Sequence, residues 1–159
     1  MNDLTELMNH TYGLCEDGNY DDAIQYFDAI LQKDPRNIRI IIDKGLTLVN
    51  LGKFNDAIKC YDKALQLEPA NTDALINKGA ALHGKKQYTE AIRFYDKALI
   101  LDPQLALALT YKGLALGESN MIKDAIWNFE KALQIDDSLE LAKNNKEIAL
   151  KLLEKRTLS

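Results

Sequence analysis

The side chains that most often carry catalysis or bind metals are scarce in this chain of 159 residues. The only histidines are His10 and His83, and the only cysteines are Cys15 and Cys60. A nucleophile needs a base and an orienting group beside it, and zinc needs three or four ligands at set spacings. The sequence offers neither pattern and contains no glycine-rich phosphate loop. We therefore expect no enzyme activity, no metal site and no cofactor.

Composition narrows the classes of partner. The net charge of −4 disfavours a nucleic-acid partner, because phosphate binding needs clustered Lys and Arg. Residues 1–35 hold eight acidic residues and one lysine, a net charge of −7, which predicts a solvated negative end. No stretch approaches the ~20 apolar residues that span a bilayer, and no secretory signal is recognisable at the N-terminus. We expect no membrane partner, and two free cysteines in a reducing, cytoplasmic compartment.

An internal repeat with a step of 34 residues is the main signal in the sequence. The segment YDKAL at 61–65 returns at 95–99 and again as FEKAL at 129–133, and a weaker copy, FDAIL, stands at 27–31. A fixed period of this length is typical of stacked helical repeats. The predicted units and final helix are 4–37, 38–71, 72–105, 106–139 and 140–156.

Each unit is predicted to form two helices. In the second unit an apolar stripe that includes Gly45 is followed by a turn, a second stripe with Ala57 and Tyr61, and then Pro69, which ends the helix. The small side chains of Gly45 and Ala57 allow the two helices to approach closely. Tyr61 is expected to fill the gap between neighbouring units. No unit buries its apolar face alone, so the units must stack.

The final segment is predicted to be a capping helix. Its lysines are expected to face water while its apolar residues cover the fourth unit. Those apolar residues are Leu139, Leu141, Ala142, Ile148, Ala149, Leu152 and Leu153.

These features resemble the tetratricopeptide repeat, a helix–turn–helix unit of 34 residues. The second unit matches its pattern at Gly45, Leu48, Ala57, Tyr61 and Pro69. The Trp of that pattern is Ile or Leu here and its Leu is Lys or His, but the spacing is kept. The resemblance implies an all-α, right-handed superhelical solenoid of antiparallel helix pairs, with residues 1–159 as a single domain. It also implies a non-catalytic scaffold or adaptor that binds a peptide or helical segment of a partner protein in a concave groove.

Carried over position by position, the resemblance assigns residues of the first helices to that groove. Its apolar members would grip apolar side chains, and its polar members would bind a peptide backbone or a basic residue. The alternative is that some of the apolar members pack between helices and touch no ligand. The assigned residues are Met8, Tyr12, Arg39, Ile42, Asp43, Leu46, Asp73, Ile76, Asn77, His83, Thr110, Tyr111 and Leu114.

Some members of the resembled family clamp the C-terminal carboxylate of heat-shock chaperones with two Lys, one Arg and two Asn. None of the matching residues here is basic, and two are acids that would repel a carboxylate. We therefore expect no such clamp. The matching residues are Met8, Tyr12, Asp43, Asp73 and Asn77.

A second surface follows from a break in the repeat. Ile100 and Trp127 are apolar at positions that are polar in the other units. Such a pair on the outer, convex side suggests a contact patch, although single apolar residues on a surface are common. The alternative function is therefore a self-associating solenoid, a homo-oligomer that uses a patch around these two residues. Their counterparts are Gln32, Gln66 and Gln134 for Ile100, and Gln25, Lys59 and Arg93 for Trp127.

Overall fold

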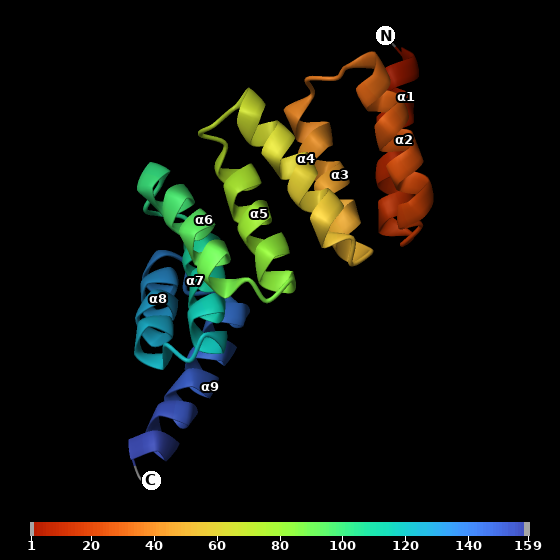
Figure 1. Ribbon diagram of the computed structural model, residues 1–159. Coiled ribbons are helices and arrows are strands. Elements are labelled where there is room, and N and C mark those ends of the chain that lie inside the picture. The colour runs from red at the N-terminus through yellow and green to blue at the C-terminus, as the bar shows by residue number, and fades with distance from the viewer. Residues whose placement is uncertain (1, 158–159) are drawn as a thin grey trace. The chain divides into compact units, whose positions relative to one another are not determined.

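The computed structural model describes residues 2–157, and within them all regular secondary structure is helical (Figure 1). This confirms the all-α repeat fold expected from the sequence. Helices α1, α3, α5 and α7 are the first helices of the repeats, and α2, α4, α6 and α8 are the second helices. The bounds are α1 Asn2–Glu16, α2 Tyr20–Lys33, α3 Ile38–Asn50, α4 Phe54–Leu67, α5 Thr72–Gly84, α6 Tyr88–Leu101, α7 Ala106–Glu118, α8 Ile122–Ile135 and α9 Glu140–Thr157.

The chain divides into two compact units. The N-terminal unit is Met1–Ala81 and the C-terminal unit is Leu82–Ser159. In the N-terminal unit α2 packs on α1, and α3 packs on both α2 and α4. In the C-terminal unit α7 packs on α6 and α8, and α9 packs on α8. Packing between sequence neighbours is the pattern of a repeat array.

The turns between first and second helices share one backbone conformation, in which a residue with a positive φ angle follows the first helix. Gly18, Gly52, Lys86 and Asn120 have φ angles of 76°, 70°, 61° and 69°, in the left-handed region. They are spaced by the 34-residue step of the repeat. In each turn the next residue donates its N–H to the carbonyl five residues before it, at N···O distances of 2.8–3.0 Å. This arrangement satisfies carbonyl groups at the end of the first helix and reverses the chain.

The two helices of a repeat meet where a glycine faces an aromatic ring. A Cβ atom added to Gly45 would lie 2.6 Å from Tyr61 Cε1, and one added to Gly113 would lie 2.6 Å from Phe129 Cε1. Both rings are buried. The close approach that the sequence predicted at Gly45 is therefore confirmed, because no side chain fits between the α3 backbone and the ring.

Adjacent repeats are also linked by a recurring ion pair. In each case a carboxylate of a second helix meets a lysine of the following helix, and the lysine is largely shielded from solvent. Each pair contributes little stability, about 0–1 kcal/mol, but it recurs in register with the repeat. The pairs are Lys44–Asp28 at 2.5 Å, Lys78–Asp62, Lys112–Asp96 at 2.6 Å and Lys146–Glu130 at 2.9 Å.

Helix α9 covers the fourth repeat with one side only. Ala142 and Ala149 are buried in the core of the C-terminal unit. Leu141, Ile148 and Leu152 are 42%, 55% and 43% exposed. Ile148 and Leu152 nevertheless line a hollow together with Leu114 and Phe129 of the fourth repeat. These two residues therefore border the fourth unit without being buried by it, whereas Leu141 does not line that hollow.

Replacing Gly113 with Ala tests the close helix contact. The added methyl group would press on the Phe129 ring, so we expect the free energy of unfolding to fall by about 1–3 kcal/mol, measured by urea denaturation. Gly117→Ala is the matched control on the same helix, because its Cβ would meet only Ala125, at 3.8 Å. This control should keep or slightly raise stability, and equal losses in both variants would contradict the packing argument.

Candidate functional site

Three of the predicted groove residues contact one another in the N-terminal unit. The Tyr12 hydroxyl donates a hydrogen bond to Asp43 Oδ2 at 2.5 Å. The Arg39 guanidinium lies 5.9 Å from the centre of the Tyr12 ring, and its Nε is 3.8 Å from Asp43 Oδ2. Burial, together with the hydrogen bond and negative charge of Asp43, raises the pKa of Tyr12 to about 12. The cluster ties α1 to α3 and leaves Asp43 at the edge of a hollow.

That hollow is acidic and has a volume of about 440 Å³. Three carboxylates and one guanidinium line it, which favours a cationic group. The sequence assignment included the first-helix residues but missed Glu68 and Asn71, because it considered no residue between the repeats. The lining residues are Ile38, Arg39, Ile42, Asp43, Glu68, Asn71 and Asp73.

Asn71 holds the loop between α4 and α5 in place through two hydrogen bonds of its side chain. Its Oδ1 accepts a hydrogen bond from the Ala74 N–H at 2.8 Å, which caps the start of α5. Its Nδ2 donates to Glu68 Oε2 at 2.9 Å, so the Glu68 carboxylate is held at the hollow. An Asn directly before a predicted helix is the signal that could have identified this loop.

The apolar groove candidates of the N-terminal unit differ in accessibility. Leu46 is 40% exposed, whereas Ile42 and Ile76 are buried at 8% and 7%. Met8 is partly buried against the core formed with α2, and Asn77 is half-buried. Leu46 is therefore the apolar candidate of this unit that is most available to a partner.

In the C-terminal unit Thr110 is buried and does not face solvent. Its hydroxyl donates a hydrogen bond to the Ala106 carbonyl at 2.9 Å, so the side chain satisfies its own helix. Tyr111 is half-buried, and its ring centre lies 6.1 Å from that of Tyr95. Leu114 lines a hollow of about 190 Å³ together with residues of α8 and α9.

His83 belongs to a polar cluster of the same unit. His83 Nε2 lies 3.2 Å from Glu118 Oε2, and the Tyr88 ring packs edge-on against the imidazole at 5.4 Å. Hydrogen bonds from the Tyr88 hydroxyl and from His83 lower the pKa of the Glu118 carboxyl. His83 thus joins α5 to α7 and has no nucleophile beside it in this cluster.

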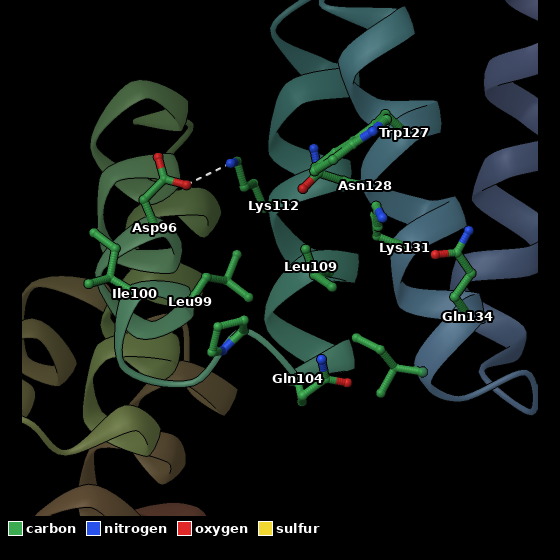
Figure 2. A pocket seen from close by; sticks show the side chains of 12 residues that line it. Asp96, Leu99, Ile100, Gln104, Leu109, Lys112, Trp127, Asn128, Lys131 and Gln134 are labelled. Carbon is green, nitrogen blue, oxygen red and sulfur yellow. Dashed lines mark ion pairs between the residues drawn. The ribbon is translucent and has the colours of Figure 1, made fainter.

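The two apolar residues that break the repeat line a hollow of the C-terminal unit (Figure 2). Ile100 on α6 is 80% exposed and Trp127 on α8 is 54% exposed. The hollow, which we call the outer cleft, lies between α6 and α8 with α7 at its floor, and has a volume of about 740 Å³. It is lined by Asp96, Leu99, Ile100, Pro103, Gln104, Leu109, Lys112, Trp127, Asn128, Lys131, Gln134 and Ile135.

A corresponding hollow of about 500 Å³ lies in the N-terminal unit. Both hollows contain the recurring Lys–Asp pair, Lys44–Asp28 in one and Lys112–Asp96 in the other. The walls differ in the polarity of the side chain at three positions in register. Gln32, Lys59 and Cys60 of the N-terminal hollow are replaced in the outer cleft by Ile100, Trp127 and Asn128.

Neither cysteine nor any acidic cluster forms a metal site in the described part of the chain. Residues 2–157 contain no group of three or more His, Cys, Asp or Glu side chains placed to hold a metal ion. Cys15 and Cys60 are free thiols, and burial raises the pKa of Cys60. Among the same residues, no helix is both long and apolar enough to cross a membrane.

Sequence profiles of the tetratricopeptide repeat match two overlapping segments. One matches residues 14–63 and the other residues 42–106. Together they reach from the first repeat to the start of the fourth, which is more than half of the chain. A search of curated protein sequences finds no match.

Solved structures with the same fold cover most of the chain. MamA from Desulfovibrio magneticus RS-1 is 22% identical, covers 98% of this chain and 93% of its own, and gives a TM-score of 0.76. The Sgt2 domain from Aspergillus fumigatus is 23% identical, with coverage of 77% and 82% and a TM-score of 0.74. The first tetratricopeptide repeat domain of Spaghetti (RPAP3), bound to the HSP90 peptide SRMEEVD, is 22% identical. It covers 74% of this chain and 93% of its own and gives a TM-score of 0.70. Identities this low establish the fold alone.

Replacing Tyr12 with Phe tests the hydrogen bond to Asp43. We expect the free energy of unfolding to fall by about 1 kcal/mol at neutral pH. The folded pKa is raised above the ordinary value of 10 to about 12. The stabilisation from this bond is therefore complete below pH 10 and is lost as the pH rises towards 12. Urea denaturation over this range should show the difference between parent and variant shrinking.

The control for that experiment is Tyr20→Phe. The Tyr20 hydroxyl makes no hydrogen bond within the described structure, so its removal should change stability little. A Tyr12→Phe variant as stable as this control would contradict the role assigned to the Asp43 contact.

Proposed function

Since the chain belongs to the tetratricopeptide repeat family, we propose that it is a non-catalytic protein-binding module, a scaffold or adaptor that receives a segment of a partner protein on its first helices. The observation that carries the proposal is the acidic hollow beside Leu46 in the N-terminal unit. Asp43, Glu68 and Asp73 supply negative charge at the hollow, and Leu46 supplies an exposed apolar contact on α3. We propose an extended or helical segment that carries basic and apolar side chains.

The charge of the hollow argues against an acidic ligand. The peptide bound to the RPAP3 domain, SRMEEVD, contains three acidic residues and one arginine. In this chain Asp43 and Asp73, two of the five positions matched to a carboxylate clamp, are acids that line the hollow. Like charges at an interface lower affinity, so we propose that such peptides are rejected.

Self-association through the outer cleft is the second candidate function. The exposure of Ile100 and Trp127 supports it, as does the replacement of polar counterparts by apolar residues at both positions. Binding at the acidic hollow uses Asp43, Asp73 and Leu46, whereas self-association uses Ile100 on α6 and Trp127 on α8. The two functions are therefore separable by mutation.

A matched pair of amphipathic peptides tests the first candidate. The two peptides share their apolar residues and carry either Lys or Glu at every polar position. We expect the Lys peptide to bind and the Glu peptide not to bind in isothermal titration calorimetry. Asp43→Asn with Asp73→Asn should weaken binding of the Lys peptide about tenfold or more, and Leu46→Glu should weaken it through lost apolar contact.

Asp17→Asn with Asp22→Asn is the control variant, because it removes the same two charges from exposed positions outside the hollow. It should leave the affinity nearly unchanged. Equal binding of the two peptides, or equal weakening by the control, would contradict the proposed recognition. Circular dichroism of each variant verifies that the helices are retained.

A further inference from the structure

Helix α8 carries a row of exposed side chains that is both basic and apolar. Lys123, Trp127 and Lys131 follow one another at intervals of four residues, which places them on one face of the helix. We call this row the α8 ridge. It is about 12 Å long, because a helix rises about 1.5 Å per residue. Trp127 and Lys131 also form part of one wall of the outer cleft, and the indole remains 54% exposed there.

The two lysines of the ridge have no counterion in the described part of the chain. The Lys131 ammonium lies 5.6 Å from the centre of the Trp127 ring, and no carboxylate comes within ion-pair distance of it or of Lys123. Two acidic residues of α8 flank the ridge. Glu130 is already in an ion pair, whereas the exposed Asp124 has no cation beside it among the described residues. The ridge thus presents two unpaired cations, one unpaired carboxylate and one indole.

The ridge is particular to α8 among the second helices. Steps of 34 residues back along the chain lead to the counterparts of its three members. None of these sets places a large apolar side chain between two lysines, so the packing of the repeat does not require the ridge. The counterparts are Asp21, Gln25 and Ala29 on α2, Asn55, Lys59 and Lys63 on α4, and Thr89, Arg93 and Lys97 on α6.

The acidic hollow of the N-terminal unit has the opposite balance of charge. Asp43, Glu68 and Asp73 supply three carboxylates, and Arg39 supplies one guanidinium whose side chain is 77% exposed. Asp73 is exposed and has no cation within ion-pair distance among the described residues. Leu46 adds an apolar side chain that is 40% exposed. Each unpaired charge of the ridge therefore has a group of opposite sign in the hollow, and the indole has an apolar group to pack on.

We propose that the α8 ridge of one copy docks on the acidic hollow of a second copy. The ridge lysines pair with the carboxylates of the hollow, Asp124 pairs with Arg39, and Trp127 packs on Leu46. The inference rests on the proposed binding at the hollow, because it names the basic and apolar segment that the hollow receives. It also gives the self-association at Trp127 its second surface. Since every copy carries both surfaces, the contact is head-to-tail and makes rings or open chains.

Two variants each reverse one charge. Lys131→Glu changes the ridge and Asp73→Lys changes the hollow, both at exposed positions. In sedimentation velocity we expect the parent to associate as its concentration rises. Each variant alone should raise the dissociation constant about tenfold or more, because like charges then face each other. Lys155→Glu and Asp17→Lys make the same changes of charge at exposed positions outside both surfaces and should associate like the parent. Circular dichroism verifies that each variant keeps its helices.

Mixing the two charge variants gives the decisive measurement. The ridge with Lys131→Glu then meets the hollow with Asp73→Lys, and the unchanged ridge of one variant meets the unchanged hollow of the other. Opposite charges face each other at both contacts, so the mixture should associate like the parent although neither variant does so alone. Trp127 is the only tryptophan of the chain. Its emission should therefore shift to shorter wavelength on mixing, as the indole becomes buried.

The Lys peptide separates this inference from the binding proposed above. The Lys131→Glu variant keeps the hollow unchanged and should bind the peptide as the parent does. Saturating peptide should also dissociate the assemblies of the parent, because peptide and ridge compete for one hollow. Failure of the peptide to bind the parent would reject the proposed peptide site and leave the mixture of variants to decide the inference.

Three results would overturn the inference. A parent that binds the Lys peptide but stays monomeric keeps the hollow as a binding site and rejects α8 as its ligand. Association that is unchanged in both charge variants, or that survives saturating peptide, places the contact on other surfaces. A mixture of the two variants that stays monomeric rejects the pairing of ridge and hollow.

Discussion

The contact between a glycine of the first helix and an aromatic ring of the second helix is the constraint on which the repeats depend. At Gly45 and Gly113 the ring occupies the space that a side chain would need. The two helix backbones therefore lie close together, and the ring is buried where they cross. Because Tyr61 and Phe129 sit at equivalent positions, one geometry is produced twice from different aromatic residues. The hydroxyl of Tyr61 has no hydrogen-bond partner, so the ring and not its polar group is what the contact requires.

The fixed geometry also explains where binding surfaces arise. Each second helix is joined to the following helix by a carboxylate–lysine pair, and two of these pairs, Lys44–Asp28 and Lys112–Asp96, line hollows between repeats. The helix packing around a hollow is therefore the same in each repeat, while the polarity of its walls depends on a few neighbouring side chains. Lys59 in one hollow and Trp127 in the other occupy the same register position with opposite character. A repeat protein of this kind acquires a new surface through single residues without any change in its packing.

The sequence predicted the repeat, the helix pairs and the close approach at Gly45, because each follows from local spacing and side-chain size. It also predicted that Ile100 and Trp127 are exposed, since their counterparts are polar. It did not predict the burial of Thr110, because a threonine that bonds to its own helix carbonyl looks the same in sequence as one that faces solvent. The Glu68–Asn71 loop was missed for another reason. Its residues lie outside the helices on which the repeat pattern is defined, and only packing brings them beside Asp43 and Asp73.

The turn between α5 and α6 differs from the first two turns in one respect. Gly18 and Gly52 adopt positive φ angles without steric cost, whereas Lys86 carries a side chain at φ 61°, which costs about 1 kcal/mol. That turn is exposed and has a second lysine, Lys85, beside it. A protease that cleaves after lysine therefore meets its preferred residue on a strained, accessible backbone. Cleavage there would release two fragments that part close to the Ala81–Leu82 boundary between the compact units.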